Sequence, residues 1–147
     1  MKYLFDTNIL LHYIRQTPLG EETDRLFSPF SSFNEAFVSV ISVGELKSIA
    51  LQNQWGVRKN NFMESFLSKM LIADINIKTV IESYAEIDAY SQNKLPGQPL
   101  PHTARNMGKN DLWIAATASV LGATLLTTDS DFDHLNKVFL PVAVIKG

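Results

Sequence analysis

The sequence contains no cysteine among its 147 residues. Disulfide bonds, thiolate nucleophiles and cysteine-based zinc sites are therefore excluded, and a reducing cytoplasm is the compartment that fits this composition most simply. No apolar run has the length that a transmembrane helix needs. The first apolar run is interrupted by Asp6, Asn8 and His12 and lacks a small-residue cleavage site. We therefore expect a cytoplasmic protein with no secretion signal and no membrane association.

Charge is also limited: 13 basic and 15 acidic side chains leave a formal net charge of −2. A net charge of this sign does not by itself suggest a polyanionic partner. The hydrophobic content of 46% and a mean hydropathy near zero are typical of a globular protein with one sizeable core. We expect residues 1–147 to form a single domain.

Short apolar strands alternate with helical patterns along the whole chain. The predicted strands cover residues 1–5, 36–40, 71–75, 124–127 and 142–145, and the predicted helices cover residues 9–14, 21–27, 42–51, 57–71, 78–92 and 110–121. This alternation predicts an α/β fold, a three-layer α/β/α sandwich with a mostly parallel sheet of about five strands. Residues 93–109 contain three prolines and two glycines, which predicts a long irregular loop of the kind that is usually functional.

Four carboxylates are predicted to gather at one edge of this sheet. Asp6, Glu45 and Asp129 follow the carboxyl ends of strands, where ligands bind in open α/β sheets, and Asp111 starts a helix packed nearby. Like charges brought together in this way raise one another's pKa unless a cation neutralises them. With only oxygen ligands available, the expected cation is Mg²⁺ or Mn²⁺, which can activate water for attack on a phosphodiester. Asp131 is a candidate fifth ligand.

Each acid also has a purely structural explanation: N-capping for Asp6, a capping box with Ser42 for Glu45, the helix dipole for Asp111, and turn formation for Asp129 and Asp131. Taken together, four separate acids at one sheet edge are hard to explain by capping alone. Capping and metal binding can also coexist in one side chain.

The motifs follow one another in a fixed order: Phe5-Asp6-Thr7-Asn8, Glu45 early in a helix, Asn110-Asp111 at a helix start, and Thr127-Thr128-Asp129-Ser130-Asp131-Phe132. This order, which spans essentially the whole chain, resembles the PIN-domain ribonucleases and in particular the VapC toxins of prokaryotic toxin–antitoxin modules. The resemblance implies that Asp6, Glu45, Asp111 and Asp129 form the family's acidic metal-binding quartet. Asp131 matches a position that is less uniformly acidic.

The resemblance has further implications for the surroundings of the acids and for partners. Thr7, Asn8 and Thr127 fall where the family has small polar residues around the site, which implies that they orient the carboxylates. It also implies an inhibitory antitoxin protein that covers the acidic site, and a toxin homodimer.

The stretch between residues 92 and 110 contains no acid but carries four basic or titratable side chains, namely Lys94, His102, Arg105 and Lys109. If metal neutralises the four acids, the rest of the chain is no longer acidic. This distribution predicts a basic strip beside Asp111 that holds the phosphates of RNA. An ordinary solvated loop is the alternative interpretation.

Three functions follow from these observations. The favoured one is a metal-dependent endoribonuclease that acts as a toxin on tRNA or another structured RNA. A phosphohydrolase of haloacid-dehalogenase type is disfavoured, because it needs a second aspartate at the position of Asn8. The third is a nucleic-acid-binding regulatory module that works with a DNA-binding partner and cleaves little or nothing; the four intact acids argue against it.

The sequence is also rich in phenylalanine, with two groups formed by Phe27, Phe30, Phe33 and Phe37 and by Phe62 and Phe66. Most of these rings are expected in the core, and a partner-binding groove is the alternative.

Overall fold

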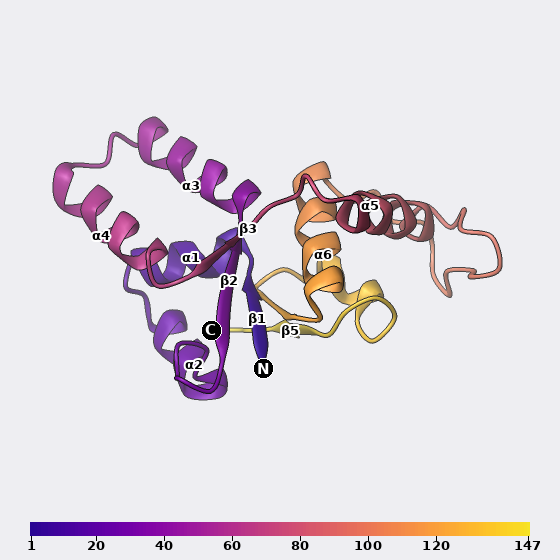
Figure 1. The fold of residues 1–147 in the computed structure, drawn as a ribbon, viewed down its shortest axis with the longest axis horizontal. Coiled ribbons are helices and arrows are strands. Elements are labelled where there is room, and N and C mark those ends of the chain that lie inside the picture. Colours follow the sequence, from indigo (N-terminus) through magenta and orange to yellow (C-terminus); the bar gives the residue numbers. More distant parts are fainter.

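A five-stranded parallel sheet forms the centre of the computed structural model, which describes residues 1–147 (Figure 1). Its strands lie in the order β3-β2-β1-β4-β5, and every neighbouring pair is parallel. The strands are β1 (Lys2–Phe5), β2 (Glu35–Ser39), β3 (Leu71–Ala73), β4 (Thr124–Thr127) and β5 (Val142–Val144). The predicted number of strands, their places and their parallel arrangement are confirmed.

Helices cover both faces of the sheet, which confirms the predicted three layers (Figure 1). One face carries α1 (Thr7–Ile14), α2 (Pro18–Phe27), α3 (Val40–Gln52) and α4 (Val57–Leu67), and the other carries α5 (Lys78–Ser91) and α6 (Lys109–Leu121). A short 3₁₀ helix, η1 (Ser130–Leu135), follows β4. No helix of the structure combines the length and apolarity needed to span a bilayer.

The alternation of side chains along the central strands supplies both cores. Leu4 and Leu125 are partners in the sheet and belong to the core under α5 and α6. The next pair, Phe5 and Leu126, belongs to the core under α1, α3 and α4. All four are fully buried, and each such side chain contributes about 1.5–3 kcal/mol of burial free energy. A slip of one residue would exchange the two faces, so this burial fixes the register and the strand ends.

The N-termini of α3 and α6 differ from the predictions. Helix α3 begins at Val40, because the Ser39 hydroxyl caps it by accepting a hydrogen bond from the Ile41 amide at 3.1 Å. The predicted capping box between Ser42 and Glu45 is therefore wrong, and both residues lie inside the helix. Helix α6 begins at Lys109 with Gly108 as its N-cap, one residue before the predicted start at residue 110.

Helix α6 ends at Leu121 as predicted, and much of it is buried. Gly122 terminates the helix in the left-handed conformation with φ of 65°, which glycine adopts without steric cost. Six residues of the helix are buried, namely Leu112, Ile114, Ala115, Ala116, Thr117 and Ala118. The helix is therefore held firmly against the sheet, and its first turn is fixed beside the strand ends.

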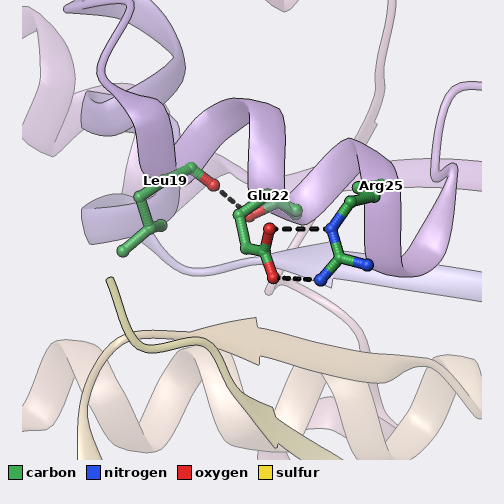
Figure 2. Close-up of polar contacts among 4 residues, drawn as sticks. Leu19, Glu22 and Arg25 are labelled. Atoms are coloured by element: carbon green, nitrogen blue, oxygen red, sulfur yellow. Dashed lines mark hydrogen bonds and ion pairs between the residues drawn. The ribbon is translucent and has the colours of Figure 1, made fainter.

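Helix α2 carries an ion pair on its exposed surface. Glu22 and Arg25 lie one turn apart, and Arg25 Nε donates to Glu22 Oε2 at 2.9 Å (Figure 2). This hydrogen bond lowers the pKa of Glu22. Because both side chains are solvated, the pair adds little to stability, and the charge of Arg25 is already matched by a carboxylate.

The irregular loop predicted for residues 93–109 covers residues 93–108, because Lys109 already belongs to α6, and it projects from the end of α5 away from the sheet (Figure 1). Two of its side chains, Leu100 and Met107, are buried in the core under α5 and α6. The Leu100 amide also donates to Asn93 Oδ1 at 2.8 Å. The loop is thus anchored at two points although it has no regular structure.

The phenylalanines divide as expected between core and surface. Phe66 is buried, Phe27 and Phe30 pack against the core under α1, α3 and α4, and Phe37 packs against the other core. The core interpretation is confirmed for these four rings. Phe33 and Phe62 are exposed, with 90% and 38% of their surface accessible.

Candidate functional site

Asp6 lies at the point where β1 passes into α1. Its Oδ1 accepts a hydrogen bond from the Thr7 amide at 2.8 Å, which caps α1, and its Oδ2 accepts one from the Thr127 hydroxyl at 2.7 Å. Only 3% of the residue is exposed. The predicted cap is therefore present, and the same two contacts hold the carboxylate in one orientation at the end of the sheet.

Glu45 reaches the same edge from the second turn of α3. Thr7 Oγ1 lies 2.9 Å from Glu45 Oε1 and 2.9 Å from Ser42 Oγ. A hydroxyl has one proton and an ionised carboxylate can only accept, so Thr7 donates to Glu45 and accepts from Ser42. The buried Ser42 thus supports Glu45 through Thr7. In the sequence, the only sign that Ser42 supports Glu45 is the Ser-x-x-Glu spacing, which also fits a capping box.

Thr127 links Asp6 to the turn that carries Asp129. While its hydroxyl donates to Asp6, it accepts from the Asp129 amide at 3.0 Å. The Asp129 carboxylate caps η1 by accepting from the Asp131 amide at 2.9 Å, which confirms its turn-forming role. Asp129 is partly buried, whereas Asp131 is exposed.

Asp111 lies in the first turn of α6 and is partly buried. Burial, and after it the charges of the other four acids, Asp6, Asp129, Glu45 and Asp131, together raise its pKa to about 6. Burial also raises the pKa of Asp6, against the hydrogen bonds from Thr127 and Thr7, with further contributions from Glu45 and Asp129. Five separate acids thus act on one another electrostatically at the carboxyl edge of the sheet.

The remaining predicted residues differ in their placement. Asn8 is exposed in the first turn of α1, and its side chain makes no hydrogen bond. Lys109 lies two residues before Asp111 in α6. Lys94 and His102 are exposed on the projecting loop, and Arg105 lies close enough to His134 to contribute, after burial, to lowering its pKa. The predicted basic strip therefore adjoins Asp111 only at its end.

The chemistry of this edge fits a hard divalent cation, because every donor is an oxygen and the surplus negative charge is partly desolvated. No three His, Asp or Glu side chains converge closely enough to hold a metal ion by themselves. Mg²⁺ commonly uses one or two carboxylates and keeps several waters. The observed placement is compatible with that mode of binding rather than with a closed protein cage.

The raised pKa of Asp111 predicts how stability depends on pH when metal is removed. The folded state holds the Asp111 proton more tightly than the unfolded state, so ionisation destabilises the fold as pH rises from about 4 to about 6. In EDTA, we expect Asp111→Asn to be more stable than the parent by about 1 kcal/mol at pH 7.5, after allowance for solvent screening. Urea unfolding at pH 7.5 and pH 4 measures this gain, which should shrink at the lower pH.

Glu35→Gln is the matched control, because it neutralises an exposed acid at the start of β2, at the opposite edge of the sheet. It should give no comparable gain. An Asp111→Asn gain of the same size at both pH values would contradict the proposed repulsion.

The PIN domain family model matches residues 3–138. Ribonuclease VapC2 of Haemophilus influenzae is 29% identical over 130 residues, which cover 88% of this chain and 87% of that protein. Among solved structures, a chain of VapBC2 from Rickettsia felis, bound to a promoter DNA fragment, has a TM-score of 0.79 at 22% identity and covers 99% of this chain and 100% of its own. A chain of VapBC-1 from nontypeable H. influenzae has a TM-score of 0.72 at 24% identity, with 98% of each chain covered.

These likenesses in structure extend over the whole sheet and both helical layers, as expected for a shared fold. The family match includes all the acids of the carboxyl edge, from Asp6 to Asp131. The chain belongs to the PIN domain family.

Proposed function

We propose that this protein is a VapC-type toxin, a divalent-metal-dependent endoribonuclease that hydrolyses RNA phosphodiester bonds at the carboxyl edge of its sheet. The observation that carries the proposal is the gathering of carboxylates from four separate elements at one edge, where burial, and after it their mutual repulsion, raises the pKa of Asp6 and Asp111. A fold gains nothing from such repulsion unless a cation joins the site. The ribonuclease named among its relatives agrees with this chemistry.

The metal would be held by Asp6, Glu45, Asp111 and Asp129, with Asp131 as a further ligand from the exposed side of η1. Mg²⁺ is the expected ion, and Mn²⁺ is its expected substitute, because both prefer oxygen ligands. When bound, the ion supplies activation of a water molecule and neutralisation of the phosphate oxygens.

The neighbouring hydroxyl groups keep the carboxylates in place for this task. Thr127 holds Asp6 by one hydrogen bond and the Asp129 turn by another, and Thr7 holds Glu45. Such contacts orient metal-binding groups and typically change affinity or activity by about 10–100-fold when lost.

The proposed substrate is tRNA or another structured RNA. Lys109, two residues before Asp111 in α6, would contact a phosphate near the bond that is cut, and Lys94, His102 and Arg105 would contact more distant phosphates. None of these side chains forms an ion pair within the chain, so their charge is available to RNA.

The proposed partner is an antitoxin that covers the acidic edge, in a complex that also contains a toxin homodimer. The solved structures of similar fold include VapBC complexes, and one is bound to promoter DNA.

A second candidate function follows from the DNA-bound complex: a nucleic-acid-binding regulatory module that acts with a DNA-binding partner and cleaves little RNA. The incomplete convergence of the carboxylates is the observation in its favour.

The first test is cleavage of a labelled total tRNA pool by the purified protein with Mg²⁺, with Mn²⁺ or with EDTA. We expect discrete fragments that require metal and disappear with Asp111→Asn, purified identically. Urea unfolding of Asp111→Asn, which we expect to be at least as stable as the parent, tests whether unfolding causes the loss of cleavage. Equal cleavage by Asp111→Asn would contradict the site, and metal binding without cleavage of any RNA would favour the regulatory module.

The second test concerns the hydroxyl that joins two acids. Thr127→Val keeps the shape of the side chain but removes the donor to Asp6 and the acceptor for the Asp129 amide. We expect kcat/KM and Mn²⁺ affinity to fall by about 10–100-fold. Calorimetric Mn²⁺ titration gives the affinity independently of the RNA.

Thr128→Val is the matched control, because the neighbouring Thr128 hydroxyl makes no hydrogen bond and is partly exposed. If both variants lose activity and affinity equally, Thr127 has no special role in orienting the acids.

A further inference from the structure

A buried polar pair lies away from the four carboxylates and is not used by the proposed chemistry. Ser91 is the last residue of α5 and His134 lies in η1, and Ser91 Oγ is 2.8 Å from His134 Nε2. Ser91 is fully buried and His134 is 7% exposed. Burial of such groups is unfavourable unless they are paired, so this contact fixes both side chains.

Ser91 also binds the returning leg of the 93–109 loop. Its hydroxyl donates to Met107 Sδ at 3.4 Å, and its carbonyl accepts from the Arg105 amide at 2.7 Å. In the contact with His134, which of the two atoms donates depends on the tautomer of the imidazole ring. One serine thus joins three segments: the end of α5, the loop that carries Arg105, and η1.

His134 transmits this contact to the acidic turn. Its ring lies parallel to that of Tyr90, with 6.4 Å between centroids and 3° between planes. Phe132 and Leu135 are fully buried on either side of it, so the turn is held against α5 along its inner surface. Asp129 caps the same turn, and its carboxylate direction therefore depends on where the turn lies.

We propose that Ser91 and His134 are positioning residues of the nuclease: their buried hydrogen bond keeps the Asp129 turn and the Arg105–Lys109 leg of the loop in one fixed relation. This inference rests on the proposed function. The acids act on the bond that is cut, and the basic leg binds the flanking phosphates. If the two segments move independently, a bound strand no longer lies where the acids can act on it.

Hydrogen–deuterium exchange and kinetics on three variants test the inference. Ser91→Ala and His134→Leu each remove the hydrogen bond, whereas His134→Gln keeps a polar group that can reach Ser91. We expect Ser91→Ala and His134→Leu to increase exchange in residues 103–109 and 128–136 together, and to lower kcat/KM about tenfold. His134→Gln should recover most of the protection from exchange and most of the kcat/KM.

Ser119→Ala is the matched control, because it removes a serine hydroxyl that donates to the Phe139 carbonyl at 2.9 Å in the same half of the molecule. It should leave the exchange in residues 103–109 and 128–136 unchanged. Increased exchange in only one of the two segments would overturn the inference. A kcat/KM for His134→Leu equal to that of Ser119→Ala would also overturn it. If the parent cleaves no RNA, the proposed function fails, but the exchange measurement still decides whether Ser91 and His134 join the two segments.

Discussion

The carboxylates at the carboxyl edge of the sheet repel one another, and the fold does not relieve this repulsion by itself. A parallel sheet brings the carboxyl ends of its strands to one edge, and in this chain the segments that follow β1, β2 and β4, together with the start of α6, each carry an acid. The hydroxyl groups of Thr127 and Thr7 orient these acids but carry no charge to balance them. The raised pKa of Asp111, caused first by burial and then by these charges, reflects a cost in stability that a bound cation would relieve.

The site also joins two halves that are packed separately. The layer of α1 and α3 carries Asp6 and Glu45, and the layer of α5 and α6 carries Asp111 and the basic loop, each over its own core. The Thr127 hydroxyl links β4 to Asp6 at the end of β1, and Ser91 links the loop to the turn after β4 within the second of these halves. Both hydrogen bonds orient polar groups on a framework that the backbone ladder of the sheet already holds together.

The sequence predicted the sheet, the layers and the edge at which the acids meet, because apolar strands and helical periods alternate clearly and because Asp6 and Asp129 stand directly after strands. It did not predict helix starts, since Ser39 and Ser42 compete as caps within four residues and only packing decides between them. The exposure of Asn8 and the outward path of the 93–109 loop were also missed. Burial of Leu100 and Met107 determines that path, and local patterns carry no information about it.

The central claim is that a divalent cation completes the acidic edge. Anomalous diffraction from crystals grown with Mn²⁺ tests it most directly, because it locates the ion without reference to any substrate. The account predicts a peak between the Asp6 and Asp111 carboxylates, about 2.0–2.2 Å from coordinating oxygens, which is absent in crystals of Asp111→Asn. A peak elsewhere on the protein, or no peak at this edge at saturating Mn²⁺, would contradict it.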